Sequence, residues 1–279
     1  SFVEQLMSDS ANVTPNNLDA FWMPFTANRQ FKKAPRMFVA AKDMYYTTAD
    51  GRKVLDATAG LWCVNAGHCR PKIVEAIRKQ AGELDYAPAF QLAHPKAFEL
   101  ANRLVDIAPE GMNHVLYTNS GSEANDTMVK MLWMINRARG ESERRKIITR
   151  HNAYHGVTIA TASMTGKPYN AEFGLPLPGF LHADCPHFWR YGLPEESEED
   201  FTQRMARNLE DLIEREGPET IAGMFAEPVQ GAGGVIPPSK GYFQAIRPIL
   251  RKFDIPLIAD EVICGFGRLG EMWGSDHYG

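Results

Sequence analysis

Four short motifs contain residues whose types and spacing could do chemistry. They are the segments 119–125 (NSGSEAN), 151–156 (HNAYHG), 226–234 (AEPVQGAGG) and 257–268 (LIADEVICGFGR). Each lies at or just after the end of an apolar run that the pattern predicts as a β-strand. Ligands of open α/β sheets bind outside the carboxyl ends of the strands. We therefore expect these motifs to form one ligand site.

The first motif could bind a phosphate. Small residues between a strand and a long helix leave backbone N–H groups free at the positive end of the helix dipole, which favours an anion. The hydroxyls of Ser120 and Ser122 would add donors. An ordinary helix N-cap explains the same residues, since Ser and Asn are preferred caps. This motif alone leaves both interpretations open.

The second motif offers an aromatic ring and two histidines. Tyr154 at a strand end could lie flat on a planar ligand. His151 and His155 are four residues apart, which is the spacing of two metal ligands on one helical face. No Glu follows His151, however, and Gly156 argues against a continuing helix. Two loop histidines are the simpler explanation.

The last two motifs bring glycines and carboxylates. The glycines of 226–234 do not follow the G-x-G-x-x-G spacing, and two prolines come where a phosphate-binding helix should begin, so Rossmann-type binding is disfavoured. Asp260 and Glu261 end an apolar strand, where a buried carboxylate needs a cationic or hydrogen-bonding partner. A protonated ring nitrogen of a ligand is one such partner. A solvated turn is the alternative.

Composition excludes several classes of protein. The 279 residues contain 44% apolar and 23% charged residues, which is typical of a globular protein and not of a disordered one. The net charge of −4 provides no basic surplus for nucleic acid. No apolar run approaches the roughly 18 residues of a membrane span, and the amino end lacks the pattern of a secretory signal. Four scattered cysteines indicate a reduced, cytoplasmic protein.

The elements that must position these motifs alternate between helix and strand. Pro71 opens a helix whose buried face we expect at Ile73, Val74, Ile77 and Ala81. A hairpin is expected over 37–55. Further strands are predicted at 114–118, 146–150, 221–226 and 256–260, and helices at 98–105, 121–139, 201–213 and 243–253. This pattern indicates a mostly parallel sheet with helices on both faces.

A phosphate cup, a stacking aromatic and a strand-end carboxylate are the three features that bind pyridoxal 5′-phosphate. Over nearly the whole chain, their order and spacing resemble the class III (ω-) aminotransferases. The resemblance implies the aspartate aminotransferase-like fold type I of enzymes that depend on this cofactor. It also implies that residues 1–66 form an amino-terminal segment belonging to the small domain. Residues 67–279 then form the large cofactor-binding domain, with its carboxyl-terminal part absent.

The resemblance also assigns roles to the residues. Asp260 pairs with the pyridine nitrogen, Glu227 lies near the hydroxyl side of the cofactor, and Phe25 and Trp62 line the substrate pocket. For these two aromatics, core packing is an equally good explanation. The remaining cofactor contacts are the phosphate-binding Ser120, Gly121 and Ser122, the ring-covering Tyr154 and Val262, and His155 beside the stacking tyrosine.

Within the family, segments 56–68 and 179–191 are similar to enzymes that move an amino group from β-alanine or another ω-amino acid to pyruvate. The products would be an aldehyde or oxo acid and L-alanine. The loop 86–94, with Phe90 and Gln91, resembles a segment that reaches the neighbouring subunit. We therefore expect small amines and keto acids as substrates and a homodimer or dimer of dimers. Nucleic acid and membrane are not expected partners.

One group that the reaction needs is not found. The lysine that forms the Schiff base and moves the proton is expected beyond Gly279, as is the arginine that binds the substrate carboxylate. The alternatives are another class III enzyme, such as a diamine aminotransferase or an aminomutase, and a lysine-lacking chain that binds a phosphate ligand without catalysis. A metal hydrolase using His151, His155 or Cys185 with His187 is a third alternative.

Overall fold

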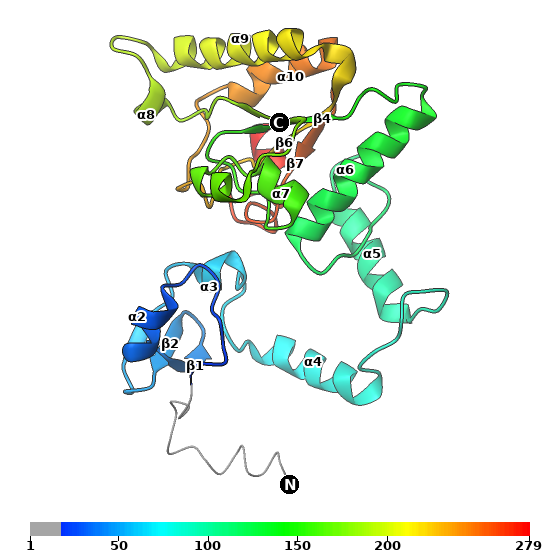
Figure 1. Ribbon diagram of the computed structural model, residues 1–279. Coiled ribbons are helices and arrows are strands. Elements are labelled where there is room, and N and C mark those ends of the chain that lie inside the picture. Colours follow the sequence, from blue (N-terminus) through cyan, green and yellow to red (C-terminus); the bar gives the residue numbers. More distant parts are fainter. Residues whose placement is uncertain (1–17) are drawn as a thin grey trace. The chain divides into compact units, whose positions relative to one another are not determined.

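A computed structural model describes residues 18–279 of the chain. The described part of the chain forms two compact units, the first ending at His94 and the second comprising Pro95–Gly279 (Figure 1). This division differs from the boundary at residues 66 and 67 expected for the domains of the whole enzyme, and that boundary stays a prediction. The helix α4 (Pro71–Glu83) accordingly belongs to the first unit.

The second unit is built on a four-stranded parallel sheet with the order β5-β4-β6-β7. The strands are β4 (Lys146–Arg150), β5 (Phe180–Ala183), β6 (Ile221–Ala226) and β7 (Leu257–Ala259). All three strand pairs are parallel, which confirms the predicted sheet. The short strand β5 was not expected, because its sequence FLHA gives too brief an apolar run to stand out.

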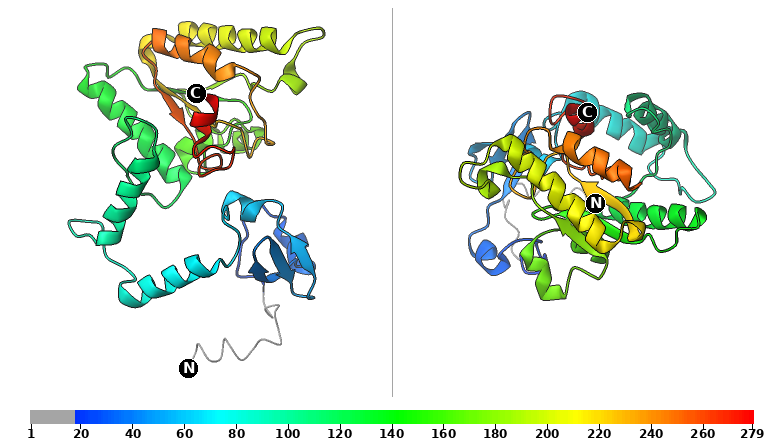
Figure 2. Two further views of the ribbon diagram at one scale, coloured as in Figure 1. Left: turned by 180° about the vertical axis from the view of Figure 1, so that it is seen from behind. Right: turned by 90° about the horizontal axis from the view of Figure 1, so that it is seen from above.

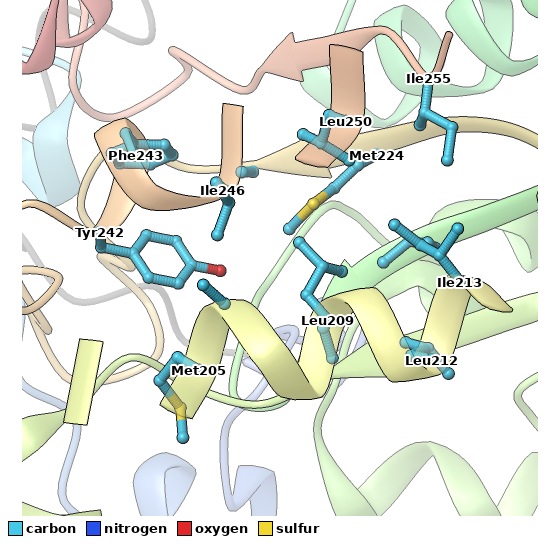
Figure 3. Close-up of a cluster of buried hydrophobic side chains, with 14 of the residues drawn as sticks. Met205, Leu209, Leu212, Ile213, Met224, Tyr242, Phe243, Ile246, Leu250 and Ile255 are labelled. Atoms are coloured by element: carbon cyan, nitrogen blue, oxygen red, sulfur yellow. The ribbon is translucent and has the colours of Figure 1, made fainter. Parts of the chain in front are cut away.

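Helices cover both faces of this sheet. Residues of β4 and β6 alternate between two buried clusters, as expected for a strand with a side-chain period of two. Ile148 and Met224 belong to the cluster shared with α9 (Glu198–Glu216) and α10 (Tyr242–Lys252). Ile147 and Phe225 belong to the cluster shared with α6 (Gly121–Ala138). In Figures 1 and 2, α9 and α10 run beside each other over one face. The larger cluster between them is shown in Figure 3.

The helix α9 (Glu198–Glu216) has a capped amino end. Ser197 caps α9 by accepting a hydrogen bond from the backbone N–H of Asp200, and the acidic run 195–200 lies at its positive end. The α-helices of this unit are α5 (Pro95–Ile107), α6 (Gly121–Ala138), α7 (Ile159–Met164), α8 (Phe188–Tyr191), α9 (Glu198–Glu216), α10 (Tyr242–Lys252) and α11 (Gly274–Tyr278), and the 3-10 helices are η1 (Pro168–Phe173) and η2 (Pro218–Thr220). None of the helices within residues 18–279 combines the length and apolarity needed to cross a membrane.

Two expectations about the amino-terminal half are wrong. The segment 114–118 is not a strand, because no described strand lies beside it to accept its backbone hydrogen bonds, and Leu116 is 62% exposed. The predicted helix from Pro71 exists, but its expected buried face is open to solvent. Ile73 and Ile77 are 48% and 63% exposed within the described residues. Periodicity correctly predicted an amphipathic helix there but not burial of its apolar face.

The first unit contains a three-stranded antiparallel meander, which extends the predicted hairpin by one strand. Its strands are β1 (Phe38–Lys42), β2 (Tyr45–Thr48) and β3 (Lys53–Leu55), and α2 (Asn28–Lys33) precedes them. After β3 the chain makes the short element α3 (Ala59–Trp62). All four residues of α3 have positive φ, between 47° and 65°, so it is a left-handed turn. Such a conformation costs about 1–2 kcal/mol for each residue other than glycine.

Candidate cofactor site

Asp260 is the centre of a hydrogen-bond network at the carboxyl end of β7. Its carboxylate is 5% exposed. One oxygen, Oδ2, lies 2.7 Å from Nδ1 of His155 and 2.9 Å from Nδ2 of Asn125. The other oxygen accepts from the backbone N–H of Val262 at 3.2 Å. The network therefore joins the end of β7 to α6 and to the loop after β4, as expected of a site built from strand ends.

The surroundings of Asp260 keep its carboxyl ionised. Burial raises the pKa, but the hydrogen bond and positive charge of His155 and the hydrogen bonds from Asn125 and Val262 lower it, and the net result is a pKa below the ordinary value. A carboxylate has about four acceptor positions, and three of them are occupied here by the donors named above. Capacity remains for one further donor from a ligand.

Glu227 is a second buried carboxylate, immediately after β6. Its Oε1 accepts from the backbone N–H of Tyr154 at 3.0 Å and its Oε2 from that of Gly231 at 2.9 Å. Burial is the main reason that the pKa of Glu227 is raised above its usual value. The side chain thus links the tyrosine-bearing loop to the glycine-rich turn. Together with the network around Asp260, it joins all four motifs at one edge of the sheet.

The amino end of α6 presents backbone donors to which an anion could bind. Ser120 caps the helix by accepting from the N–H of Glu123, and Ser122 Oγ accepts from the N–H of Val157 at 3.1 Å. The N–H groups of Gly121 and Ser122 have no acceptor among the described residues, as is normal for the first turn of a helix. The sequence motif is therefore both a cap and a source of free donors.

Glycines allow the loops to come this close to the helix. A Cβ on Gly121 would lie 2.7 Å from Cγ2 of Val262, and a Cβ on Gly156 would lie 2.3 Å from Oγ of Ser122. Gly156 also has a φ of 140°, which side chains rarely adopt. Both positions therefore require glycine for the motifs to meet.

These residues fit the predicted pyridoxal 5′-phosphate. The helix end offers free donors to a phosphate, and Val262 lies beside Gly121 and is 66% exposed. Tyr154 is half-buried on the loop that Glu227 fixes. The spare acceptor position of Asp260 suits a protonated ring nitrogen. The free donors, the two side chains predicted to cover the ring and the carboxylate therefore occur together in the second unit.

The structure brings together the predicted residues of the second unit. His155 contacts the carboxylate of Asp260 and is fully buried, with its ring packed edge-to-face with that of Phe225. Phe25 and Trp62 belong to the first unit, where Phe25 is 78% exposed and Trp62 half-buried. Neither is part of a buried core, so the core-packing explanation does not hold for the described unit.

The arrangement disfavours the metal hydrolase. His155 is engaged with Asp260, while the ring of His151 stacks on that of His182 with centroids 5.6 Å apart. Cys185 Sγ contacts the amide oxygen of Gln230 at 3.4 Å. Across residues 18–279, no cluster of three His, Cys, Asp or Glu side chains has the geometry to hold a metal ion.

Sequence reasoning missed two residues of the site. Asn125 was part of a quoted motif but received no role, although a polar residue on the same helical stripe as Val129 and Leu132 signals a buried hydrogen bond. Arg150, at the end of β4, is fully buried and donates to the backbone carbonyl of Glu227. The only sign of this role in the sequence is a charged residue at the end of an apolar strand.

Comparisons with known proteins show the family to which the chain belongs. The family model for class-III aminotransferases matches residues 26–279. An omega-aminotransferase from Caulobacter vibrioides is 47% identical over 95% of this chain and 60% of its own length, and the tomato protein named gamma aminobutyrate transaminase 1, mitochondrial, is 49% identical over 91% and 50%. The structure of an omega-aminotransferase from Paracoccus denitrificans matches with a TM-score of 0.89 and 53% identity, covering 93% of this chain and 58% of that one.

A further solved structure, a PMP-bound aminotransferase from Vibrio fluvialis, matches with a TM-score of 0.90 and 51% identity, covering 95% of this chain and 60% of that chain. PMP is the amino form of the cofactor that the site fits. The chain spans about half to three-fifths of the lengths of these relatives. It belongs to the class III aminotransferases, the pyridoxal-phosphate-dependent family of fold type I.

Proposed function

We propose that the protein carrying this chain transfers the amino group of an ω-amino acid or amine to a keto acid. We propose β-alanine as the type of donor and pyruvate as the acceptor. The observation that carries the proposal is the buried carboxyl group of Asp260, held by His155 and Asn125 at the same sheet edge as the amino end of α6. The names of the relatives, omega-aminotransferase and gamma aminobutyrate transaminase, support donors with a terminal amine.

We propose that different residues contact different parts of the cofactor. We assign the phosphate to the free N–H groups of Gly121 and Ser122 and to the hydroxyls of Ser120 and Ser122. Tyr154 and Val262 cover the two faces of the ring. The carboxylate of Asp260 accepts from the protonated ring nitrogen, and His155 and Asn125 keep that carboxylate charged and oriented. The bound cofactor supplies an electron sink for the carbanion formed when the donor loses a proton.

Glu227 has a separate role. Its two oxygens are occupied by the N–H groups of Tyr154 and Gly231. We propose that Glu227 fixes the loop that carries the stacking tyrosine and borders the hydroxyl side of the cofactor. Trp62 and Phe25 would form apolar walls for a donor whose reacting carbon bears no carboxylate.

The lysine needed for proton transfer stays a prediction beyond Gly279. Lys146 contacts Glu216 at 3.1 Å, and Lys252 contacts Glu210 at 2.7 Å. Lys167 donates to the carbonyl of Ala232 at 3.1 Å. Each of these amines has a partner within the described residues, and we assign none of them to catalysis.

The proposal is tested on the whole natural protein with its cofactor bound. Addition of β-alanine should bleach the long-wavelength absorbance of the cofactor, and addition of pyruvate should restore it with formation of alanine. γ-Aminobutyrate in parallel distinguishes the donor type. If neither amine changes the spectrum, the proposed donor class is wrong. An intact mass near 31.2 kDa with no bleaching would instead support a chain that binds the cofactor without catalysis.

The Asp260→Asn variant tests the assignment of the ring-nitrogen contact. An amide cannot supply the negative charge, so bleaching by donor should slow by at least about 100-fold. The exposed Asp254, at the end of α10, gives a control variant, Asp254→Asn, which should react at the wild-type rate. A wild-type rate in Asp260→Asn would contradict the assignment.

We further propose a homodimer or dimer of dimers in a reducing compartment such as the cytoplasm. Tyr86 and Phe90 of the loop 86–94 are 75% and 82% exposed, as expected of side chains available to a partner subunit. All four cysteines have free thiols. The mass of the native protein in solution tests the assembly.

A further inference from the structure

The left-handed turn α3, Ala59–Trp62, is a concentrated piece of backbone strain in the first unit. Ala59, Leu61 and Trp62 all have positive φ without being glycine. Such residues persist only where surrounding contacts fix them, and they gather where a side chain must be presented in one orientation. Leu61 is 65% exposed, so its side chain does not anchor the turn in an apolar core. The contacts that fix the turn must come from elsewhere.

Asp56 supplies those contacts. Its carboxylate is buried and lies at the start of the turn. Oδ2 accepts from the backbone N–H of Gly60 at 2.7 Å, in the middle of the turn, and Oδ1 lies 3.2 Å from both the N–H and the hydroxyl of Thr58. One carboxylate therefore fixes the backbone on two sides of Ala59.

His68 holds the carboxylate in place. Its Nε2 lies 2.7 Å from Oδ2 of Asp56. The backbone of His68 exchanges two hydrogen bonds with Asp43, of 2.7 and 3.0 Å, and its ring packs on Tyr46 with centroids 4.5 Å apart. The hydrogen bond from His68 is the largest reason that the pKa of Asp56 lies below its ordinary value. The pair is thus anchored to the meander.

We propose that the Asp56–His68 pair positions the turn α3. The pair holds Ala59–Trp62 in the left-handed conformation, so that the side chain of Trp62 has one orientation. The inference rests on the proposed function in one respect, the placing of Trp62 in the donor pocket. Asp56 and His68 are positioning residues in this scheme, and neither touches the donor or the cofactor.

Kinetics of the whole holoenzyme test the proposal. Asp56→Asn should raise the KM for the amino donor about tenfold, because an amide cannot accept all the hydrogen bonds of the carboxylate. The dissociation constant of the cofactor should change less than about twofold. The control Asp50→Asn removes an exposed aspartate of the same unit, paired with Arg52, and should leave both values unchanged. An unchanged donor KM in Asp56→Asn overturns the proposal.

Rescue by glycine separates positioning from general destabilisation. Glycine adopts positive φ without strain, so adding Ala59→Gly to Asp56→Asn should return the donor KM to within about threefold of wild type. Ala57 has no positive φ, and Ala57→Gly in the same background should give no recovery. Equal effects of the two glycines would overturn the proposal. If Asp56→Asn does not fold, His68→Gln carries the same test, with and without Ala59→Gly.

A readout that does not depend on activity comes from Cys63, which follows the turn and contacts the carbonyl of Leu61 through its Sγ at 3.4 Å. Cys63 is exposed, and its alkylation should be several-fold faster in Asp56→Asn, because the contact with Leu61 is lost, and should return to the wild-type rate with Ala59→Gly. Absence of any donor-dependent bleaching in the wild type would refute the proposed function alone. An alkylation rate that is the same in all variants would refute the positioning role alone.

Discussion

At the scale of single residues, a buried carboxylate needs donors to stay charged. Asp260 has three, and two of them come from side chains distant in sequence. The strand-end carboxylate was predictable because it ends an apolar run. Its partners were not, since His155 could equally have been a loop histidine or a metal ligand, and Asn125 one of several polar residues at a cap. Only the folded chain decides which donors face which acceptor.

The His155→Gln variant tests this dependence. With the hydrogen bond and charge of His155 removed, the pKa of Asp260 should rise. When folding lowers the pKa of a carboxyl group, the charged group stabilises the fold at pH values above its pKa in the unfolded chain. That stabilisation is lost as the pH falls through its pKa in the folded protein. The acid limb of the donor half-reaction should therefore move to higher pH in His155→Gln. The measurement is the rate of cofactor bleaching against pH.

The matched control is His151→Gln, which removes the other histidine of the same motif. His151 stacks on His182 and forms no contact with Asp260 among the interactions described. Its acid limb should coincide with that of the wild type. Equal acid limbs for His155→Gln and the wild type would show that His155 does not maintain the charge of Asp260.

At the scale of elements, the amino end of α6 and the loop after β4 act as one surface. The long helices were predictable from their apolar stripes, and so were β4 and β6, which are buried along their whole length apart from Lys146. The segment 114–118 shows the limit of such reasoning. An apolar run has strand propensity, but a strand forms only beside a neighbour, and pairing is not encoded in a local pattern.

Gly156→Ala tests the contact between loop and helix. The added methyl would lie 2.3 Å from Oγ of Ser122, so the loop or Ser122 must move. We expect cofactor affinity about tenfold weaker and an unfolding free energy lower by about 1–3 kcal/mol. Titration of the apo protein with cofactor and thermal unfolding are the measurements.

Gly174→Ala is the control for the backbone contribution. Gly174 also has positive φ, of 70°, but nothing lies within 4 Å of an added Cβ. It should lose some stability through strain and keep its cofactor affinity. Matching cofactor affinities in the two variants would mean that the close approach at Gly156 does not shape the anion site.

At the scale of the whole molecule, the parallel sheet has an open edge. Parallel sheets are normally buried, yet β7 pairs only with β6 within the described residues. Apolar side chains elsewhere in the same unit, such as Met112 and Leu116, are 63% and 62% exposed. The α/β class, the parallel direction of the strands and the family could be predicted from the sequence, because four motifs each follow the end of an apolar strand. The open edge could not, because exposure depends on which segments are neighbours.

A polypeptide restricted to residues 1–279 should therefore self-associate. An unpaired strand edge can pair with another chain, and exposed apolar surface favours such contacts. We expect light scattering after size-exclusion chromatography to show a mass that grows with concentration up to roughly 50 µM. Ala259→Lys, which places a charge on β7, should reduce the growth. A monomer of constant mass would contradict the prediction.

The hydrogen bond between Asn125 and Asp260 joins residues 135 positions apart. A ribosome adding about 5–20 residues per second needs about 7–27 s to cover that distance. During this interval the amino end of α6 has emerged without the carboxylate that completes the site. Cofactor capture during synthesis should consequently begin only after β7 has left the ribosome, which makes this site one of the last parts of the unit to mature.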